Sequence, residues 1–335
     1  MVKSSPRTLV LTRTDVECLL DAASCIDAVE RAFLERARGG VVRGGVLGVS
    51  AEGGGFHAKA ALLGGAGAPR YFAAKLNSNF PANPRERGLP TIQGVLALFH
   101  ASTGVPLAVM DSIGITLLRT AAATAVAARH LALPGAELAT IVGCGAQAMA
   151  QLVALHSARR LRRVFAFDTD RHTAQACADS VSRRLGVPVE VPDDLRSATR
   201  ASRLIVTCTT ARTPFLGVED VEPGTFIAAV GADAEDKQEI APALMARAAV
   251  VVDDLDQCAT IGDLRHAIAA GTMRREDVRS ELAGVVADPS RGRRDSGEIV
   301  VFDSTGVALE DVAAARVVYE RALEERRGLE VTFSA

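Results

Sequence analysis

The sequence feature that most constrains the fold is a short apolar run that ends in a glycine-rich turn and continues directly into a helical pattern. It spans residues 139–148, Ala-Thr-Ile-Val-Gly-Cys-Gly-Ala-Gln-Ala. Gly143 permits a tight turn, Gly145 lets backbone N–H groups approach a pyrophosphate, and the small Ala148 lets the helix pack closely on the strand. The pattern predicts the first strand and phosphate-binding turn of a dinucleotide-binding unit, although similar turns occur in α/β proteins that bind no nucleotide. Its candidate cofactor contacts are Gly143, Gly145, Ala146 and Gln147.

The segment around this turn alternates strand-like and helix-like patterns. Predicted strands at 139–142, 163–167, 187–191, 204–207 and 226–230 are separated by predicted helices at 147–158, 171–185 and 194–201. Strands joined by helical crossovers form a parallel sheet. The fold class is therefore predicted to be α/β, with a doubly wound parallel sheet of the Rossmann type in this part of the chain.

An acidic residue lies where such a unit contacts the ribose of the cofactor. Asp168 follows the second predicted strand, 23 residues after Gly145, and a carboxylate there hydrogen-bonds the adenosine ribose hydroxyls. It favours NAD, because it would repel the 2′-phosphate of NADP. Arg171 and His172 are close in sequence, so NADP is not excluded, and a helix-capping role is the alternative for Asp168.

Small polar residues follow two later strands of the same unit. The fourth strand ends in residues 207–210, Thr-Cys-Thr-Thr, and the next strand ends in residues 230–233, Val-Gly-Ala-Asp. Ligands of open α/β sheets bind at the carboxyl ends of the strands. Thr209 and Val230 are therefore further candidates for cofactor contacts, at two edges that would line one crevice.

The first third of the chain has a different pattern, and a length of 335 residues favours two domains. Capping-box spacing at Thr14–Glu17 and Ser24–Asp27 predicts two helices near the start. Further predicted elements are strands at 55–63, 70–76, 91–99 and 105–110, a Pro- and Asn-rich loop at 77–90, a helix at 115–133, a strand at 298–302 and a closing helix at 308–329.

Composition and charge exclude several function classes. A net charge of −2 argues against a nucleic-acid-binding protein that works through bulk electrostatics. No apolar run reaches transmembrane length and the first residues lack a signal-peptide core, so we expect a soluble, cytoplasmic protein with no membrane partner. The six cysteines form no C-x-x-C pair, so a structural metal is not expected, and only Cys144, in the turn itself, stands out as sensitive to oxidation.

Four motifs and one lysine together resemble the ornithine cyclodeaminase/mu-crystallin family, which includes alanine dehydrogenases and ketimine reductases. The resemblance covers nearly the whole chain. It rests on Lys75 and on the motifs Leu118–Thr124, Gly143–Ala148, Gly231–Glu239 and Val301–Gly306.

The resemblance implies a homodimer whose subunit has two domains. Residues 119–307 would form the NAD-binding Rossmann domain. Residues 1–118 and 308–335, from both chain ends, would form a second α+β domain for substrate binding and dimerisation.

The resemblance also implies roles for individual residues. Lys75 and Asp233 would be catalytic, with the lysine near the substrate carbonyl or imine and the aspartate facing the substrate amine. Arg119 would bind the α-carboxylate, assisted by Arg43, and Thr91 would contribute a pocket hydroxyl. Ser304 would contact the nicotinamide ring. From the residues alone, Lys75 could equally be a surface lysine, Arg119 an interdomain ion pair and Asp233 a loop cap.

These residue types suit hydride transfer between a nicotinamide and the α-carbon of an amino or imino acid. A guanidinium holds a carboxylate bidentately, a lysine can donate a proton, and an aspartate can stabilise a cationic nitrogen. The first hypothesis is NAD(H)-dependent reduction of a small α-imino acid to an L-amino acid. One alternative is an ornithine cyclodeaminase that recycles NAD internally and releases ammonia, and another is a binding protein that retains the fold without turnover.

The substrate itself is left open by the sequence. His57 and Lys59 precede Lys75 in a neighbouring predicted strand, and their charge would suit a second carboxylate, as in iminosuccinate. The alternative is that both residues face solvent or form structural pairs. Small cyclic imines such as pyrroline-2-carboxylate and the imine of alanine are the other candidates.

Overall fold

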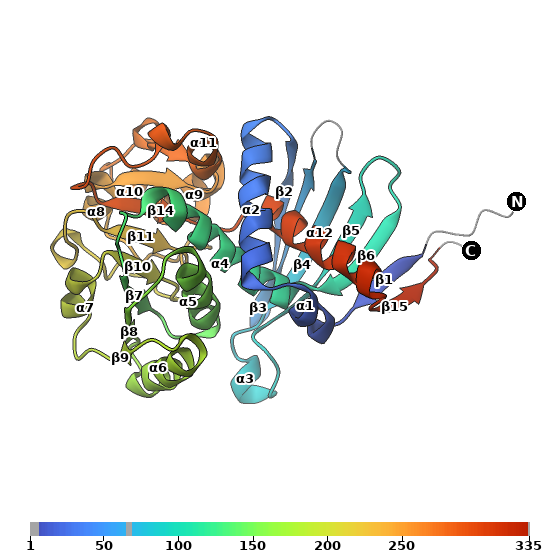
Figure 1. Cartoon of the computed structure of the whole chain (residues 1–335), viewed down its shortest axis with the longest axis horizontal. Coiled ribbons are helices and arrows are strands. Elements are labelled where there is room, and N and C mark those ends of the chain that lie inside the picture. Colours follow the sequence, from blue (N-terminus) through green and yellow to red (C-terminus); the bar gives the residue numbers. More distant parts are fainter. Residues whose placement is uncertain (1–6, 65–68, 334–335) are drawn as a thin grey trace, which may run out of the picture. The chain divides into compact units, whose positions relative to one another are not determined.

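The computed structural model describes residues 7–64 and 69–333. The chain divides into two compact units, each with its own sheet (Figure 1). Unit 1 comprises Met1–Arg119 and Val307–Ala335, and unit 2 comprises Thr120–Gly306. Within the described ranges, no helix has both the length and the apolar character needed to cross a bilayer.

Unit 1 is built on a seven-stranded sheet in the order β15-β1-β6-β5-β4-β3-β2. Neighbouring strands are antiparallel except for the parallel pair β1 and β6. Its strands are β1 (Thr8–Leu11), β2 (Val41–Ala51), β3 (Gly54–Leu63), β4 (Tyr71–Asn79), β5 (Ile92–His100), β6 (Pro106–Asp111) and β15 (Leu329–Val331). Its helices are α1 (Arg13–Leu19), α2 (Ala22–Ala37), α3 (Asn83–Glu86) and α12 (Ala308–Glu325).

The two faces of the unit 1 sheet differ in what covers them. Helices α2 and α12 pack on one face (Figure 1), and the side chains of Tyr71, Ala73 and Lys75 on β4 are buried there. Because successive strand residues point to opposite faces, Leu76 lies on the other face, where it is 49% exposed. We call these the helix-covered face and the open face.

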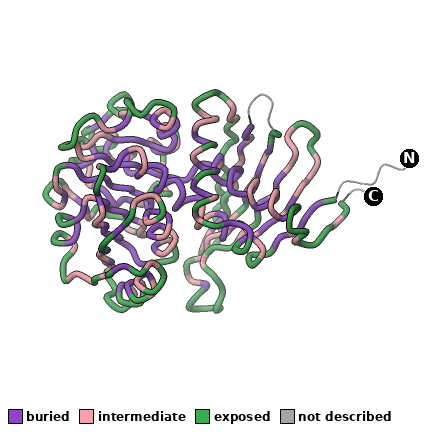
Figure 2. Tube along the Cα trace, in the orientation of Figure 1, coloured by how far each residue is buried: buried purple, intermediate pink, exposed green. Residues whose placement is uncertain are grey.

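Unit 2 contains an eight-stranded sheet in the order β13-β12-β14-β11-β10-β7-β8-β9, and every strand pair is parallel. The predicted parallel, doubly wound sheet is confirmed. All residues of β10, β11 and β14 are buried (Figure 2). The strands are β7 (Leu138–Val142), β8 (Arg163–Phe167), β9 (Val189–Glu190), β10 (Leu204–Thr207), β11 (Phe226–Ala229), β12 (Ala249–Val252), β13 (Ser280–Glu281) and β14 (Val300–Asp303).

The helices of unit 2 lie mostly between successive strands of this sheet. They are α5 (Ala146–Ala158), α6 (Arg171–Leu185), α7 (Leu195–Ala201), α8 (Pro242–Arg247), α9 (Leu255–Ile261), α10 (Asp263–Ala269) and α11 (Leu282–Ala287), with 3-10 turns at Val218–Asp220, Arg275–Asp277 and Pro289–Arg291. Helix α4 (Ser112–Leu131) begins in unit 1 and ends in unit 2.

Among the predicted strands, β9 and β4 differ most in length from the structure. Strand β9 is shorter than predicted, because Pro188 has no N–H to donate and only its carbonyl joins the ladder, accepting from Val164. Strand β4 is longer, because Asn77, Ser78 and Asn79, which were expected to begin a loop, pair with β5. Pairing with a neighbouring strand has overridden the turn preference of these residues.

The predicted helix caps near the start were wrong by two or three residues. The capping box of α1 is formed by Thr12 and Asp15, and the N-cap of α2 is Asp21, whose carboxylate accepts from the Ser24 backbone N–H. Thr14 and Ser24 therefore lie inside the first turns. An acid three residues after a hydroxyl recurs by chance in a segment this polar, so spacing alone did not fix the start.

Buried carboxylates organise the chain around the first turn of α10. Asp303, at the end of β14, accepts from the backbone N–H groups of Asp263 (3.3 Å) and Leu264 (2.9 Å). Oδ1 of Asp263 in turn accepts from the N–H groups of Glu239 and Ile240, both at 2.9 Å. Burial, followed by the nearby charge of Glu239, raises the pKa of Asp263 to about 7.

We expect Asp263→Asn to stabilise the protein at pH 8 and to have little effect at pH 5. The folded chain binds a proton at Asp263 below about pH 7, whereas the unfolded chain releases it near pH 4. The contribution of Asp263 to the free energy of unfolding is therefore fully present below pH 4 and is lost as the pH rises to 7. Asparagine keeps the Oδ1 acceptor without the charge. We therefore expect the free energy of unfolding to increase by about 2 kcal/mol at pH 8.

Thermal unfolding followed by circular dichroism at pH 5 and pH 8 measures this difference. Asp179→Asn is the control, because Asp179 is an exposed residue on α6 that bonds only Gln175 among recorded partners. An Asp263→Asn protein that is less stable than the native protein at both pH values would contradict the assignment.

Candidate functional site

A cavity of about 390 Å³ lies at the carboxyl ends of the central strands of unit 2. It is where the reversal of strand order at β7 and β10 predicts a ligand in a doubly wound sheet. Its lining includes the glycine turn, the end of β8 and the segment after β10. The lining residues are Val142, Gly143, Gly145, Phe167, Asp168, Thr169, Leu195, Cys208, Thr209, Thr210, Ala211 and Phe215.

The glycine turn has the backbone form that its sequence predicts. Gly143 has φ of +93°, and a Cβ atom there would lie 2.9 Å from the carbonyl oxygen of Cys208, so only glycine fits without strain. Gly145 caps α5 without contributing a capping side chain, and a Cβ there would meet no atom within 4 Å. The start of α5, at Ala146 and Gln147, is therefore open to an anionic group on the positive end of the helix dipole.

Asp168 has two roles in this cavity. Its Oδ2 accepts from the backbone N–H of Cys144 at 2.8 Å, which holds the glycine turn against the end of β8, and its Oδ1 accepts from Asp170 N–H at 3.0 Å. An ionised carboxylate has about four acceptor positions, so it can also accept from ribose hydroxyls. The expected helix-capping alternative belongs to Asp170, whose side chain caps α6.

The remaining cofactor candidates lie at the ends of the neighbouring strands. Thr209 lines the cavity, and Val230 is buried with its N–H bonded to the carbonyl of Thr207. Ser304 follows β14, and its buried hydroxyl has no hydrogen-bond partner among the residues that the structure describes. An unpartnered hydroxyl, an open glycine edge and a carboxylate are the donor and acceptor set that a dinucleotide requires.

In unit 1, the structure brings Lys75 and Arg119 together in a buried ion-pair cluster. Lys75 Nζ donates to Asp311 Oδ1 at 2.9 Å and to Thr116 Oγ1 at 3.2 Å. Arg119 forms ion pairs with Glu310 through Nη1 at 2.8 Å and with Asp311 through Nε at 3.0 Å. Lys75 is 6% exposed, so neither cation is the surface residue that its type would suggest.

The charged residues of this cluster shift one another's pKa values. Burial lowers the pKa of Lys75 to about 8, with Asp311 opposing that shift and Arg119 adding to it. Burial would raise the pKa of Asp311, but Lys75 and Arg119 outweigh it, so that this pKa lies below its usual value. Asp311 is therefore ionised at neutral pH, and Lys75 can gain or lose a proton close to neutral pH.

Sequence reasoning missed Glu310 and Asp311. The helix 308–329 was predicted as an amphipathic closing element, and acids in a first turn are common because they suit the helix dipole. A usable signal was present, since Asp311 shares a helical stripe with Ala315, Val318 and Ala322, all of which are buried. A charge at a core position of such a stripe requires a buried partner.

Lys59 lies directly opposite Lys75 in the pairing of β3 with β4, on the helix-covered face. Its charge also contributes to the lowered pKa of Lys75. His57 pairs with Asn77 on the same face, one pair further along. The hypothesis that these two residues add positive charge beside Lys75 therefore has a structural basis for Lys59.

Three other predicted residues lie outside the buried cluster. Arg43 is exposed on β2, opposite Ala61, and Thr91 immediately precedes β5, where its carbonyl accepts from Phe80 N–H. Asp233 is exposed in the segment after β11 and forms an ion pair with Lys237 at 2.5 Å. Their proposed roles stay predictions.

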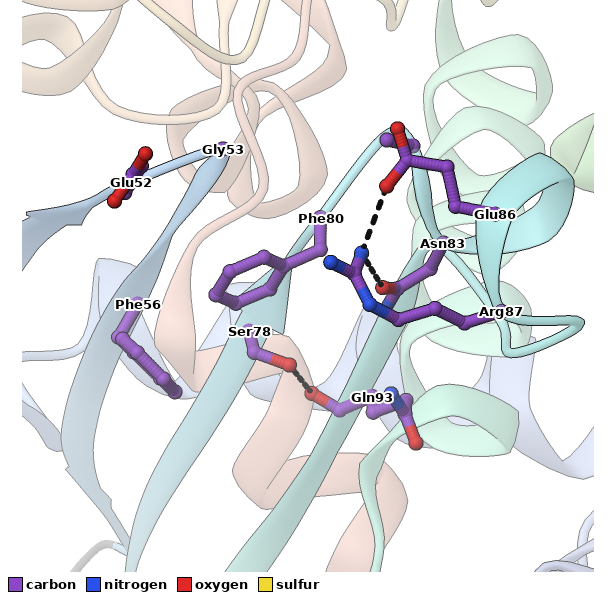
Figure 3. Close-up of a pocket in the computed structure, with 10 residues that line it drawn as sticks. Glu52, Gly53, Phe56, Ser78, Phe80, Asn83, Glu86, Arg87 and Gln93 are labelled. Atoms are coloured by element: carbon purple, nitrogen blue, oxygen red, sulfur yellow. Dashed lines mark hydrogen bonds and ion pairs between the residues drawn. The ribbon is translucent and has the colours of Figure 1, made fainter.

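A second cavity, of about 670 Å³, lies on the open face of unit 1 (Figure 3). Phe56, Ser78 and Gln93 line it from three neighbouring strands. Ser78 is three residues from Lys75 and so faces the opposite side of the sheet. This cavity is therefore separate from the buried cluster.

We expect Asp311→Asn to destabilise the protein by about 3 kcal/mol at pH 7, because it leaves Lys75 and Arg119 without a shared counter-charge in a buried site. The loss should be smaller at pH 9, where Lys75 is neutral in both proteins. Urea denaturation at the two pH values measures it. Combining Lys75→Met with Asp311→Asn should recover part of the lost stability. If the double variant instead loses as much stability as the two single variants added together, Lys75 and Asp311 are not coupled.

Comparison with known proteins agrees with this architecture. The profile of the ornithine cyclodeaminase/mu-crystallin family matches residues 7–326. The chain is 38% identical to the alanine dehydrogenase of Archaeoglobus fulgidus over 328 residues, 97% of this chain and 98% of that protein. It is 35% identical to the iminosuccinate reductase of Paracoccus denitrificans over 322 residues, 94% and 96% of the two chains.

Solved structures give the same result. A dimeric archaeal alanine dehydrogenase with bound NAD superimposes with a TM-score of 0.93 and 37% identity, covering 98% of this chain and 100% of the other. The resemblance inferred from the motifs is confirmed, because the family profile covers nearly the whole chain and relatives above 30% identity span it. The chain belongs to the ornithine cyclodeaminase/mu-crystallin family.

Proposed function

We propose that this protein is an NAD(H)-dependent oxidoreductase that reduces a small α-imino acid to an L-amino acid. The observation that carries the proposal is the buried pair of Lys75 and Arg119, a proton donor beside a guanidinium. The relatives named above, an alanine dehydrogenase and an iminosuccinate reductase, support the same reaction class. Both are proteins whose substrates carry an α-carboxylate.

The cavity of unit 2 supplies the cofactor site in this proposal. Gly143 and Gly145 would admit the pyrophosphate, Asp168 would accept from the adenosine ribose, and the hydroxyls of Thr209 and Ser304 would bind further along the molecule. When bound, the nicotinamide supplies or accepts the hydride. The NAD complex of the archaeal relative supports NAD as the cofactor.

Lys75 and Arg119 have separate tasks. The guanidinium of Arg119 binds the substrate α-carboxylate while Glu310 and Asp311 hold its orientation. The ammonium of Lys75 donates a proton to the imine nitrogen, because an iminium carbon accepts hydride far better than a neutral imine. A pKa of about 8 suits this donor, since a catalytic acid works best when its pKa lies near the working pH.

Asp233 would stabilise the cationic nitrogen. Its carboxylate is paired with Lys237 and half exposed in this structure, so that this role requires the carboxylate to face the substrate as well as Lys237. The Asp233–Lys237 pair is open to solvent, where ion pairs contribute little to stability. The substrate amine could therefore replace Lys237 as the partner of Asp233 at little cost.

Oxidation of NADH by a substrate panel tests the proposal. Pyruvate with ammonia, oxaloacetate with ammonia, and pyrroline-2-carboxylate sample a monocarboxylic imine, a dicarboxylic imine and a cyclic imine. The dicarboxylic imine is included because Lys59 lies opposite Lys75. We expect turnover with at least one, a preference for NADH over NADPH because of Asp168, and a loss of kcat/KM of roughly 100-fold or more in Lys75→Met.

Two results would overturn the proposed reaction in different ways. Ammonia release from ornithine at constant NADH absorbance would identify a cyclodeaminase. Binding of NADH without turnover of any imine would identify a binding protein. Arg316→Met, which changes a cation of the covering helix α12 near Tyr71, is the matched control for Lys75→Met and should retain activity.

We further propose that the protein acts as a homodimer in the cytoplasm, with the open face of unit 1 as the interface. Leu47, Leu76 and Val95 lie in one row across β2, β4 and β5, and each is about half exposed or more. Contiguous apolar residues in such number mark an interaction surface. The archaeal relative is a dimer, which supports a second copy of this chain as the occupant.

Replacing Leu47 and Leu76 together by lysine should convert the dimer to a monomer, because four buried cations would then face one another across a two-fold interface. Sedimentation velocity measures the oligomeric state. Leu323→Lys is the control, since Leu323 is similarly exposed but lies on α12. A Leu47→Lys, Leu76→Lys protein that stays dimeric would place the interface elsewhere.

A further inference from the structure

Glu239 is a fully buried carboxylate that joins two segments of unit 2. Its Oε1 accepts from the backbone N–H and the hydroxyl of Thr209, at 2.7 and 2.8 Å. Its Oε2 accepts from the Thr207 hydroxyl at 2.7 Å and from the Gly231 N–H at 2.8 Å. The side chain therefore connects the end of β10 to the segment that follows β11.

The pattern of donors indicates that this carboxylate is ionised. Each of its oxygens accepts from one backbone N–H group, which can only donate, and from one threonine hydroxyl, and four donated hydrogen bonds favour the ionised form. Burial raises the pKa of the Glu239 carboxyl, and the hydrogen bonds from Thr207, Thr209 and Gly231 oppose that rise. Its hydrogen-bond partners are all neutral, and no cation among residues 7–64 and 69–333 forms an ion pair with it.

The carboxylate lies immediately behind residues that the cofactor would contact. Thr209 lines the cavity next to the glycine turn, and Gly231 begins the segment that carries Asp233. A Cβ at Gly231 would lie 2.5 Å from both Glu239 Oε1 and the Thr209 carbonyl oxygen. These two segments and the carboxylate are thus packed with no space for a side chain between them.

The position of Asp168 indicates which half of the cofactor would be held near Glu239. Asp168, at the end of β8, is on one side of β7 and would bind the adenosine ribose, and the glycine turn after β7 would bind the pyrophosphate. Strands β10 and β11 are on the other side of β7. Residues at the ends of β10 and β11, in front of Glu239, would therefore hold the nicotinamide half.

We propose that Glu239 is a positioning residue for the nicotinamide half of the cofactor, and that its buried negative charge favours the positively charged NAD⁺ over NADH. The inference rests on the proposed binding of NAD(H). Glu239 would have two effects. Its hydrogen bonds position the segments after β10 and β11, which changes the affinity for NAD⁺ and for NADH equally. Its negative charge changes the affinity for NAD⁺ relative to that for NADH, because only NAD⁺ carries the positive charge on the nicotinamide ring.

Direct binding of NAD⁺ and NADH to the 335-residue chain, measured by isothermal titration calorimetry, separates the two effects. Glu239→Gln removes the charge, and its amide N–H₂ would face the Gly231 N–H, which needs an acceptor. We expect both dissociation constants to rise, with the ratio of the NAD⁺ to the NADH constant increasing by about tenfold. An equal rise for both forms would reduce Glu239 to a structural residue and overturn the charge effect.

Two further variants keep the result interpretable. Asp303→Asn changes another buried carboxyl group of unit 2, one whose pKa burial raises well above its usual value and whose side chain accepts from the start of α10, and it should leave the ratio unchanged. Thr207→Val removes one of the four donors but keeps the charge; it should weaken both forms by a similar small factor, about two- to fivefold. A changed ratio in either variant would contradict the proposal.

Thr207→Val also decides the matter if Glu239→Gln does not fold. Thr207 is buried behind the cavity, so a folded Thr207→Val protein with unaltered cofactor affinity would overturn the positioning role. If the native protein binds neither NAD⁺ nor NADH, the proposed cofactor is wrong. If the native protein binds both forms but the variants do not show the expected changes in affinity, the proposed role of Glu239 is wrong and the proposed cofactor is not.

Discussion

The carboxylate of Asp311 is the contact on which the proposed substrate residues depend. Lys75 and Arg119 are two cations buried between a sheet and its covering helices, and each disfavours the charge of the other. Removing an ion from water costs several kcal/mol unless a partner of opposite charge compensates. Asp311 contacts both cations and Glu310 contacts the second. The charge of Asp311 opposes the lowering of the Lys75 pKa by burial, and the two carboxylates together hold the orientation of the Arg119 guanidinium.

Unit 2 meets the same constraint with different partners. Glu239, Asp263 and Asp303 are buried carboxylates that accept hydrogen bonds from backbone N–H groups and hydroxyls. Parallel strands end in segments that have no ladder to satisfy their backbone donors, and a buried N–H without an acceptor is costly. Side-chain carboxylates supply those acceptors at the carboxyl ends of the strands. The edge of the sheet that would bind the cofactor is consequently fixed before any ligand arrives.

Much of the fold was predictable because its determinants are local. Alternation of strand and helix patterns, with a glycine turn between the first pair, predicted the parallel sheet, and the predicted bounds of β8, α6 and β10 agree with the structure. The extension of β4 through Asn79 was missed because it depends on a pairing partner elsewhere in the chain, and the predicted strand at 187–191 was too long because Pro188 has no N–H to donate. Gly143 could be identified because a tight turn imposes its φ whatever the rest of the chain does.

The residues that hold the site could not be found in the same way. Asp311 lies 236 residues from Lys75, and Glu310 lies 191 residues from Arg119. Motifs reveal side chains that a ligand would touch, because ligand chemistry fixes their type and spacing. They do not reveal counter-charges supplied by another element. Since α12 comes from the end of the chain and Lys75 from its first third, the charge state of Lys75 is set only when the two have packed together. Folding of unit 1 and the shift of the Lys75 pKa are thus one event.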